Sequence, residues 1–363
     1  MSERRLPTMG DVAKMAGVSP ATVARVLYEP EKVGEARRAK VQAALDATGY
    51  KPNVVARGLR TSRSWKIGLI IVDGRLNPYF VNLSQAIRLE AMAQGYTVLT
   101  FQYGSVNEPV ADSVAQLIQH RVDAVIFAYA LRPEDIAPLQ AANIPVVQVE
   151  QEAVGGTDVV ICGPQAGISD AVAHLVALGH RRIAFMGGDP AAYLRPRVSG
   201  QTMEEERLSA FRAAVAQHGA DADHSLEVLG RYFSTTGEDP AKEGRVMMQK
   251  ILDMPAPPTA ILASSDMLVA GILQVLSARG LRVPQDFSVI GFDDSIAPLL
   301  APAVSSIGRP LGDVAKAAIA CVMGAIDDSP HRPLRHVFPT ELRLRDSTAP
   351  LAGAARPLSA AKA

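Results

Sequence analysis

From Lys66 onward the sequence alternates short apolar, β-rich runs with segments whose apolar residues recur at helical spacing. The runs are KIGLIIVD, YTVLTFQY, VDAVIFAY, IPVVQV, DVVIC, RRIAFMGG, SLEVLG, PTAILASS and FSVIGFDD. Apolar strands that alternate with amphipathic helices are typical of parallel sheets covered by helices on both faces. Nine strands are more than one sheet usually contains, so the pattern predicts an α/β core of two lobes.

Length and composition favour a globular protein of more than one domain. The chain has 363 residues, of which 48% are hydrophobic and 20% charged. No apolar run reaches the roughly 18 residues of a spanning helix, and MSERRLPTMGD at the start lacks the apolar part of a secretory signal. We therefore expect a cytoplasmic protein without a membrane partner. Cys162 and Cys321 are far apart, which favours two core residues over a disulfide framework or a zinc finger.

The balanced net charge conceals an asymmetry between the two ends of the chain. Residues 1–64 hold twelve Lys/Arg and six Asp/Glu, a balance of +6, and the remainder carries −6. A basic segment of this kind is a candidate for binding a polyanion such as DNA.

The first fifty residues predict short helices and no strand. Thr8 and Asp11 have the spacing of a capping box at the start of a first helix, which Gly17 ends. Ser19 can cap a second helix, with Pro20 in its first turn.

The second helix has two different faces. Its apolar side chains toward the first helix are Val23, Val26 and Leu27, and the opposite face carries Pro20, Ala21, Thr22 and Arg25. This arrangement fits a helix-turn-helix whose second helix enters a major groove. A generic helical hairpin with a solvated arginine is the alternative.

A third helix and a basic segment follow. GEARRAKVQAALDATGY places Val41, Ala44 and Leu45 on one face and ends at Gly49, which completes a three-helix module. In KPNVVARGLRTSRS a helix from Pro52 would be too short to be stable alone. It could form on DNA and insert Leu59 into the minor groove, or the segment could be an ordinary basic linker.

These segments together resemble the lactose/purine repressor family of bacterial transcriptional regulators. The likeness runs from about Thr8 to Asp346. It rests on DVAKMAGVSPATVARVL, KVGEARRAKVQAALDATGYKPNVVARGL, HLVALGHRRIAF, SSDMLVAG and SVIGFDD. It implies a repressor that binds a palindromic operator as a homodimer and whose DNA affinity a small effector controls, with a sugar or sugar derivative as the expected effector. The C-terminus lacks the leucine-rich helix of the family's tetramers, so we expect a dimer.

The resemblance also implies domains and DNA contacts. The expected parts are a headpiece (1–50), a hinge (51–65), a first lobe (66–163 and 309–328), a second lobe (164–308 and 329–346) and a disordered tail (347–363). The expected DNA-binding residues are Thr8, Ser19, Pro20, Ala21, Thr22, Arg25, Tyr28, Asn53, Arg57 and Leu59. Tyr28 stands where the family usually has Asn, Ala24 where it has Ser, and Gly34 where it has a Ser/Thr cap, so some phosphate contacts and the start of the third helix should be weaker.

In a two-lobed α/β core the ligand lies beyond the carboxyl ends of the strands. By resemblance, the effector contacts are Tyr79, Phe80, Glu150, Arg207, Ser265, Asp266, Asp293 and Arg309. Carboxylates there accept hydrogen bonds from hydroxyl pairs, arginine donates, and aromatic rings stack on a sugar face. The alternatives are helix caps for the two aspartates, surface charges for Glu150 and Arg207, and core positions for the aromatic pair.

Two departures from the family pattern bear on which ligand the chain binds. Gly163 and Pro164 replace the Asp-Asn pair that the family usually has after its fifth strand, so a polar contact is missing. The long 187–207 loop carries Arg195 and Arg197, which would favour an acidic or phosphorylated ligand if they face the pocket; a solvated loop is the alternative.

The sequence argues against an enzyme. GRLNPYF, not GxGxxG, follows the first strand, and neither GxxxxGK[ST] nor GxSxG occurs. The histidines form no HExxH and no close metal pair, so we expect no catalytic residue, no metal and no cofactor. A transport protein that only captures sugar is a further alternative, which the basic headpiece disfavours.

Overall fold

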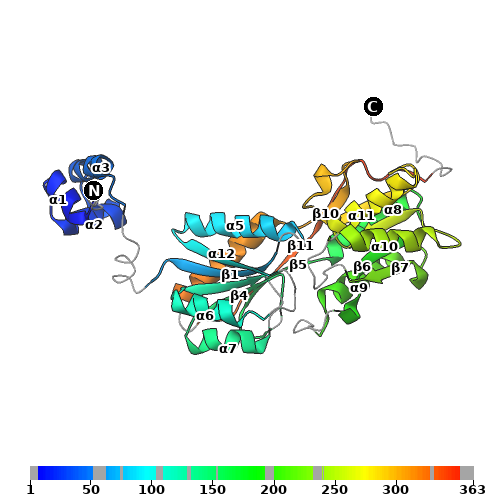
Figure 1. Ribbon diagram of the computed structural model, residues 1–363, viewed down its shortest axis with the longest axis horizontal. Helices are drawn as coiled ribbons and strands as arrows, with labels where there is room; N and C mark the ends of the chain where they lie inside the picture. The colour runs from blue at the N-terminus through cyan, green and yellow to red at the C-terminus, as the bar shows by residue number, and fades with distance from the viewer. Residues whose placement is uncertain are drawn as a thin grey trace, which may run out of the picture. The chain divides into compact units, whose positions relative to one another are not determined.

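The computed structural model describes residues 7–51, 63–73, 77–103, 109–128, 132–152, 154–192, 200–231, 239, 241–327 and 331–351. The chain divides into two compact units, Met1–Trp65 and Lys66–Ala363. The first unit is helical in its described part and the second contains two sheets (Figure 1). Within the described residues, no helix is long and apolar enough to cross a membrane.

The first unit contains α1 (Met9–Ala16), α2 (Pro20–Tyr28), the 3-10 turn η1 (Pro30–Lys32) and α3 (Glu35–Thr48). The predicted capping box is confirmed, because the Asp11 amide donates to Thr8 Oγ1 and the Thr8 amide to Asp11 Oδ2. Gly17 ends α1 with φ 65°, a left-handed conformation that suits glycine. The Thr22 amide donates to Ser19 Oγ at 3.2 Å, so Ser19 caps α2 as expected.

A small apolar core holds this unit together. Its buried residues are Val12, Ala13, Val23, Val26, Val41, Ala44 and Leu45. Gly34 precedes α3 without a side-chain cap, as its identity implied. The predicted three-helix module is therefore confirmed.

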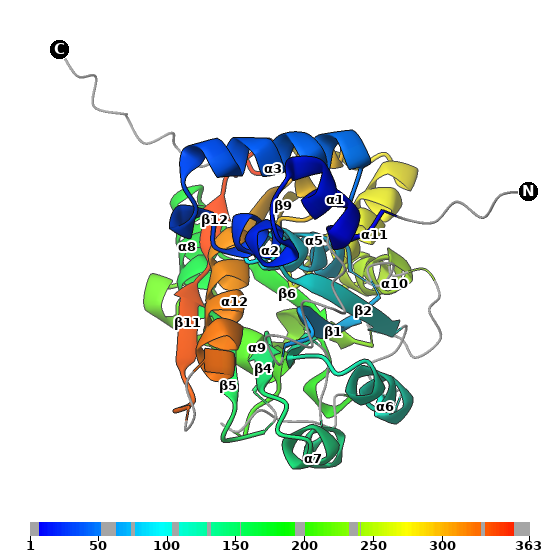
Figure 2. The same cartoon turned by 90° about the vertical axis from the view of Figure 1, so that its left-hand side faces the viewer.

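The first lobe of the second unit is built on a parallel sheet in the order β11-β5-β4-β3-β1-β2. Its strands are β1 (Lys66–Val72), β2 (Thr97–Tyr103), β3 (Ala124–Ala128), β4 (Val146–Val149), β5 (Asp158–Gly163) and β11 (Arg335–Pro339). Figure 1 shows α5 (Tyr79–Ala93) and α12 (Leu311–Asp327) on one face, and α6 (Ala111–Gln119) and α7 (Pro133–Ala141) on the other. Helix α12 packs against β3, β4 and β5, and the view of Figure 2 shows it close to β5.

The second lobe has a sheet in the order β12-β10-β9-β8-β6-β7, in which β12 alone runs antiparallel to its neighbour. The strands are β6 (Ile183–Gly188), β7 (Glu227–Gly230), β8 (Ala260–Ala263), β9 (Ser288–Asp293), β10 (Ser305–Gly308) and β12 (Glu341–Arg343). Its helices are α8 (Gln165–Ala177), α9 (Met203–His218), α10 (Ala241–Leu252) and α11 (Asp266–Ala278), with 3-10 turns η2 (Pro190–Ala192), η3 (His224–Leu226) and η4 (Ala297–Leu299).

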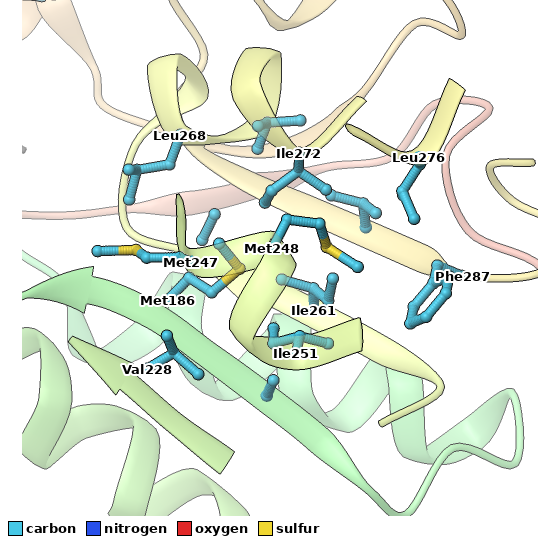
Figure 3. Close-up of a cluster of buried hydrophobic side chains, with 14 of the residues drawn as sticks. Met186, Val228, Met247, Met248, Ile251, Ile261, Leu268, Ile272, Leu276 and Phe287 are labelled. Carbon is cyan, nitrogen blue, oxygen red and sulfur yellow. The ribbon is translucent and has the colours of Figure 1, made fainter. Parts of the chain in front are cut away.

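Alternate residues of each central strand pack on opposite faces of this sheet, which explains the continuous apolar runs. Met186 and Ile261 meet α10 and α11 in the cluster that Figure 3 shows. Phe185 and Leu262 pack toward α8 and α9. Helices α10 and α11 cross closely, since a Cβ on Gly271 would lie 2.2 Å from the Ala241 carbonyl oxygen.

The nine predicted strands are all present, but the expected boundary of the second lobe is wrong. The sequence places residues 329–346 in that lobe, whereas β11 pairs with β5 in the first sheet and only β12 belongs to the second. Strand β11 is an edge strand whose side chains alternate between exposed and half-buried, so it has no continuous apolar run.

The expected start of the tail is also wrong. Ser347 is fully buried: its hydroxyl donates to the Val289 carbonyl and accepts from the Ser305 amide. Further along, His180 Nε2 lies 3.0 Å from the Ala349 carbonyl oxygen. Composition could not show these partners, because they are far away in the sequence. Residues 347–351 are ordered parts of the second lobe, and 352–363 lie outside the described residues.

Candidate functional site

The exposed face of α2 has the residues that the sequence predicted there. Pro20, Ala21 and Arg25 are exposed, while Val23 and Val26 are buried. Because the buried face is committed to the headpiece core, these three side chains are available to a partner. Of the other expected DNA contacts, Thr8 and Ser19 cap helices, Thr22 and Tyr28 are half-buried, and Asn53, Arg57 and Leu59 lie outside the described residues.

In the second unit, three expected effector residues form a buried charge cluster. Glu150 follows β4 of the first lobe, Asp293 ends β9 of the second, and Arg309 follows β10, where the chain crosses between lobes. Arg309 Nη2 donates to Asp293 Oδ1 at 2.6 Å, and its Nη1 lies 3.4 Å from Glu150 Oε2. The pKa of Arg309 is raised well above its usual value, because Asp293 and Glu150 outweigh the cost of burial.

Aromatic and amide groups complete the cluster. The guanidinium of Arg309 lies 4.0 Å from the ring centroid of Tyr79 and 5.4 Å from that of Phe292. The Tyr79 hydroxyl donates to Glu150 Oε1 at 2.7 Å, and burial and Glu150 raise the pKa of Tyr79. Asn77 Nδ2 donates to Asp293 Oδ2 at 2.7 Å, a second bond between lobes.

Both acidic residues of the cluster have unusual backbone conformations. Glu150 has φ 58° and Asp293 has φ 94°. Non-glycine residues rarely adopt positive φ, and such strain concentrates at functional sites. The fold therefore maintains an unfavourable conformation at two strand ends that face the same arginine.

A second arginine lies beside this cluster. Arg207 on α9 donates from Nη1 to Glu204 Oε1 at 3.0 Å and to the Ser264 carbonyl at 3.3 Å. Its guanidinium is 4.6 Å from the ring centroid of Phe292. Arg207 is 3% exposed and Glu150 is 2% exposed, so the alternative that they are surface charges is wrong.

The two arginines line a small cavity. Its volume is about 10 Å³, room for one water molecule. The lining residues are Glu150, Cys162, Pro164, Met203, Glu206, Arg207, Phe292 and Arg309. Any larger occupant therefore requires these side chains or the lobes to move. The described residues include no group of three His, Cys, Asp or Glu that could hold a metal ion.

The other expected effector residues have internal partners. Phe80 packs edge-on to Tyr79 in the first lobe, and Ser265 caps α11. Asp266 is fully buried and accepts hydrogen bonds from the Ser306 hydroxyl and from three backbone amides of residues 295–297. Burial and Asp293 raise the pKa of Asp266 to about 7, although these hydrogen bonds lower it. None of the three lines the cavity.

Some residues of the site were not singled out from the sequence. Asn77 begins the NPYF motif, Glu204 lies one helical turn before Arg207, and Phe292 immediately precedes Asp293. The spacing of Glu204 from Arg207 is an i,i+3 pair and could have indicated it. Arg195 and Arg197, on which the idea of an acidic ligand rested, lie outside the described residues.

The chain is similar to known transcriptional regulators over nearly its whole length. Residues 8–53 match the model for bacterial regulatory proteins of the lacI family, and 172–348 match a periplasmic binding protein-like domain. The transcriptional regulator DegA of Bacillus subtilis is 31% identical over 352 residues, 95% of this chain and 98% of DegA. The repressor PurR of Vibrio atlanticus is 27% identical, over 90% of this chain and 94% of PurR.

The chain is also similar to solved structures of transcriptional regulators. The lac repressor dimer bound to operator and the anti-inducer ONPF has a TM-score of 0.72 and 26% identity, covering 95% of this chain and 100% of that one. The complex of the regulator CelR with cellobiose has a TM-score of 0.65 and 25% identity, covering 94% and 99%. These relatives are regulators rather than enzymes. The chain belongs to the lacI family of bacterial regulatory proteins.

Proposed function

We propose that this regulator represses transcription by binding a palindromic operator as a homodimer, and that a small, uncharged, hydroxyl-rich effector between its lobes sets its DNA affinity. The observation that carries the effector part is the buried cluster of Glu150, Asp293 and Arg309, which joins groups of both lobes at strand ends. Ligands of open α/β sheets bind at that edge.

The chemistry of the cavity favours a neutral sugar or sugar derivative. The negative charges of Glu150 and Glu206 in the lining are balanced by the positive charges of Arg207 and Arg309. The lining therefore has no net positive charge that would attract an anionic ligand. Carboxylates accept from hydroxyl groups, guanidinium groups donate to sugar oxygens, and an aromatic ring such as Phe292 can pack on an apolar sugar face. The cellobiose complex of CelR is a structural precedent in a similar protein.

For the homodimer, an apolar stripe on α5 supplies a candidate contact surface. Val81, Leu89 and Met92 are each about half exposed on this helix. Exposed apolar side chains on one helix favour an interaction site there. A dimer formed there would present two copies of α2, which matches a two-fold symmetric DNA site.

Selection of DNA by the purified protein tests the DNA-binding part. Genomic fragments incubated with the full chain at moderate ionic strength should yield one enriched palindrome whose half-sites are about one helical turn apart. The physical reason is that base contacts by the exposed face of α2 add to phosphate binding only at a matching sequence. Retention of fragments without sequence preference would contradict the proposal.

A further inference from the structure

Arg309 occupies the place that an effector would take. Its guanidinium lies 4.0 Å from the ring centroid of Tyr79 and 5.4 Å from that of Phe292, and it contacts one carboxylate of each lobe, Glu150 and Asp293. A planar donor near aromatic rings, paired with a carboxylate of each lobe, is how a pocket of this composition would hold a ligand. Here the chain itself provides that donor.

We propose that Arg309 is an internal ligand, which latches the two lobes together while the cleft holds no effector. The inference rests on the proposed effector site and adds its regulation. An effector whose hydroxyl groups bind Glu150 and Asp293 must replace Arg309 at the same carboxylate oxygens. A cavity of about 10 Å³ leaves no room for both.

The location of Arg309 suits such a latch. It follows β10 of the second lobe and precedes α12, which packs on the sheet of the first lobe. Movement of one lobe relative to the other must therefore act on this segment. The hydrogen bond from the uncharged Asn77 side chain to Asp293 also joins the two lobes. If Arg309 were removed, this hydrogen bond would still connect Asp293 to the first lobe.

The latch leaves one donor of Arg309 without a hydrogen-bond acceptor in the part of the chain that the structure describes. Among the described residues, Arg309 Nη1 is buried without a hydrogen-bond acceptor, although it is at ion-pair distance from Glu150. A buried donor without an acceptor is costly. Arg309 is therefore held by fewer hydrogen bonds than it can make, so its displacement from the two carboxylates costs less than that of a fully bonded arginine.

The distance between the lobes, measured in the full chain without DNA and without effector, tests the latch. Spin labels at Gln140→Cys on α7 and Gln217→Cys on α9 report this distance, because both positions are exposed and the native Cys162 and Cys321 are buried. We expect Arg309→Ala to shift the distribution to longer distances by about 2 Å or more, the scale of domain rearrangements. Millimolar methylguanidinium should reverse that shift by replacing the missing group.

Arg345→Ala is the matched control. Arg345 is also largely buried, and its Nη1 binds Asp294 and the Val304 carbonyl within the second lobe. This variant should keep the distribution of the parent chain and should not respond to methylguanidinium. Equal distributions in Arg309→Ala and the parent, or equal opening in both arginine variants, would overturn the latch.

A second variant keeps the test valid if Arg309→Ala does not fold. Glu150→Gln removes the charge on the first-lobe side of the latch and leaves Asp293 to pair with Arg309. Its distribution should also shift to longer distances, and an unchanged distribution in this folded variant would count against the latch. Loss of sequence-specific DNA binding by the parent chain would refute the proposed function alone, since the distance measurement involves no DNA.

Discussion

Replacing Asp266 with alanine is expected to lower the free energy of unfolding by about 3 kcal/mol or more, because several buried donors lose their acceptor at about 1 kcal/mol or more each. Asp266 Oδ2 accepts from the Ser295 amide at 2.7 Å, and from the amides of residues 296 and 297. Its Oδ1 accepts from the Ser306 hydroxyl at 2.7 Å. The carboxylate thus fixes the loop after β9 to β10. Urea unfolding of the full chain measures the loss.

Asp266→Asn is the matched variant for this prediction. Asparagine keeps the size of the side chain and one oxygen acceptor, so its loss of stability should be clearly smaller than that of alanine. Packing around this carboxylate is tight at Gly291, since a Cβ there would lie 2.5 Å from Asp266 Oδ1. An alanine variant as stable as the parent would show that these hydrogen bonds make no net contribution to the free energy of unfolding.

Replacing Arg25 with alanine is expected to reduce the preference for operator over random DNA by about 1–3 kcal/mol, the usual value of one arginine contact to a base. Arg25 is exposed on α2 beside Pro20 and Ala21, and its helix is fixed by the Ser19 cap. Titration of labelled operator and random duplexes at the same salt concentration measures both affinities.

Arg38→Ala on α3 is the control for this prediction. Arg38 is also exposed and cationic but lies on a different helix. Its removal should weaken operator and random DNA about equally, as for a charge that acts only through the phosphates. Equal losses of preference in both variants would contradict the assignment of base reading to α2.

The headpiece could be predicted in detail because its determinants are local. The capping box of Thr8 and Asp11, the left-handed Gly17 and the Ser19 cap all act within a few residues. Short apolar runs likewise predicted nine of the strands, β1 to β9. The predictions for the edge strand β11 and for the segment from Ser347 are wrong, because each is held by a partner far away in the sequence, β5 and β9 respectively.

The candidate site could be predicted in part. The family resemblance indicated Glu150, Asp293 and Arg309, and the structure brings these three together. Sequence could not show that Asp266 turns toward a loop rather than the cavity, since this depends on the register of β9 and β10. It also could not show the bond from Asn77 to Asp293, which joins residues of different lobes.

The proposed function requires that one chain couple a cleft for a small molecule to a DNA-binding headpiece. Coupling between two sites is reciprocal, and typical values are about 1–3 kcal/mol. The equilibrium affinity of the full chain for its selected operator, titrated with and without a saturating sugar that binds the chain, measures this coupling directly. A change of about 5- to 150-fold is predicted, and an operator affinity unaffected by every tightly binding ligand would contradict the account.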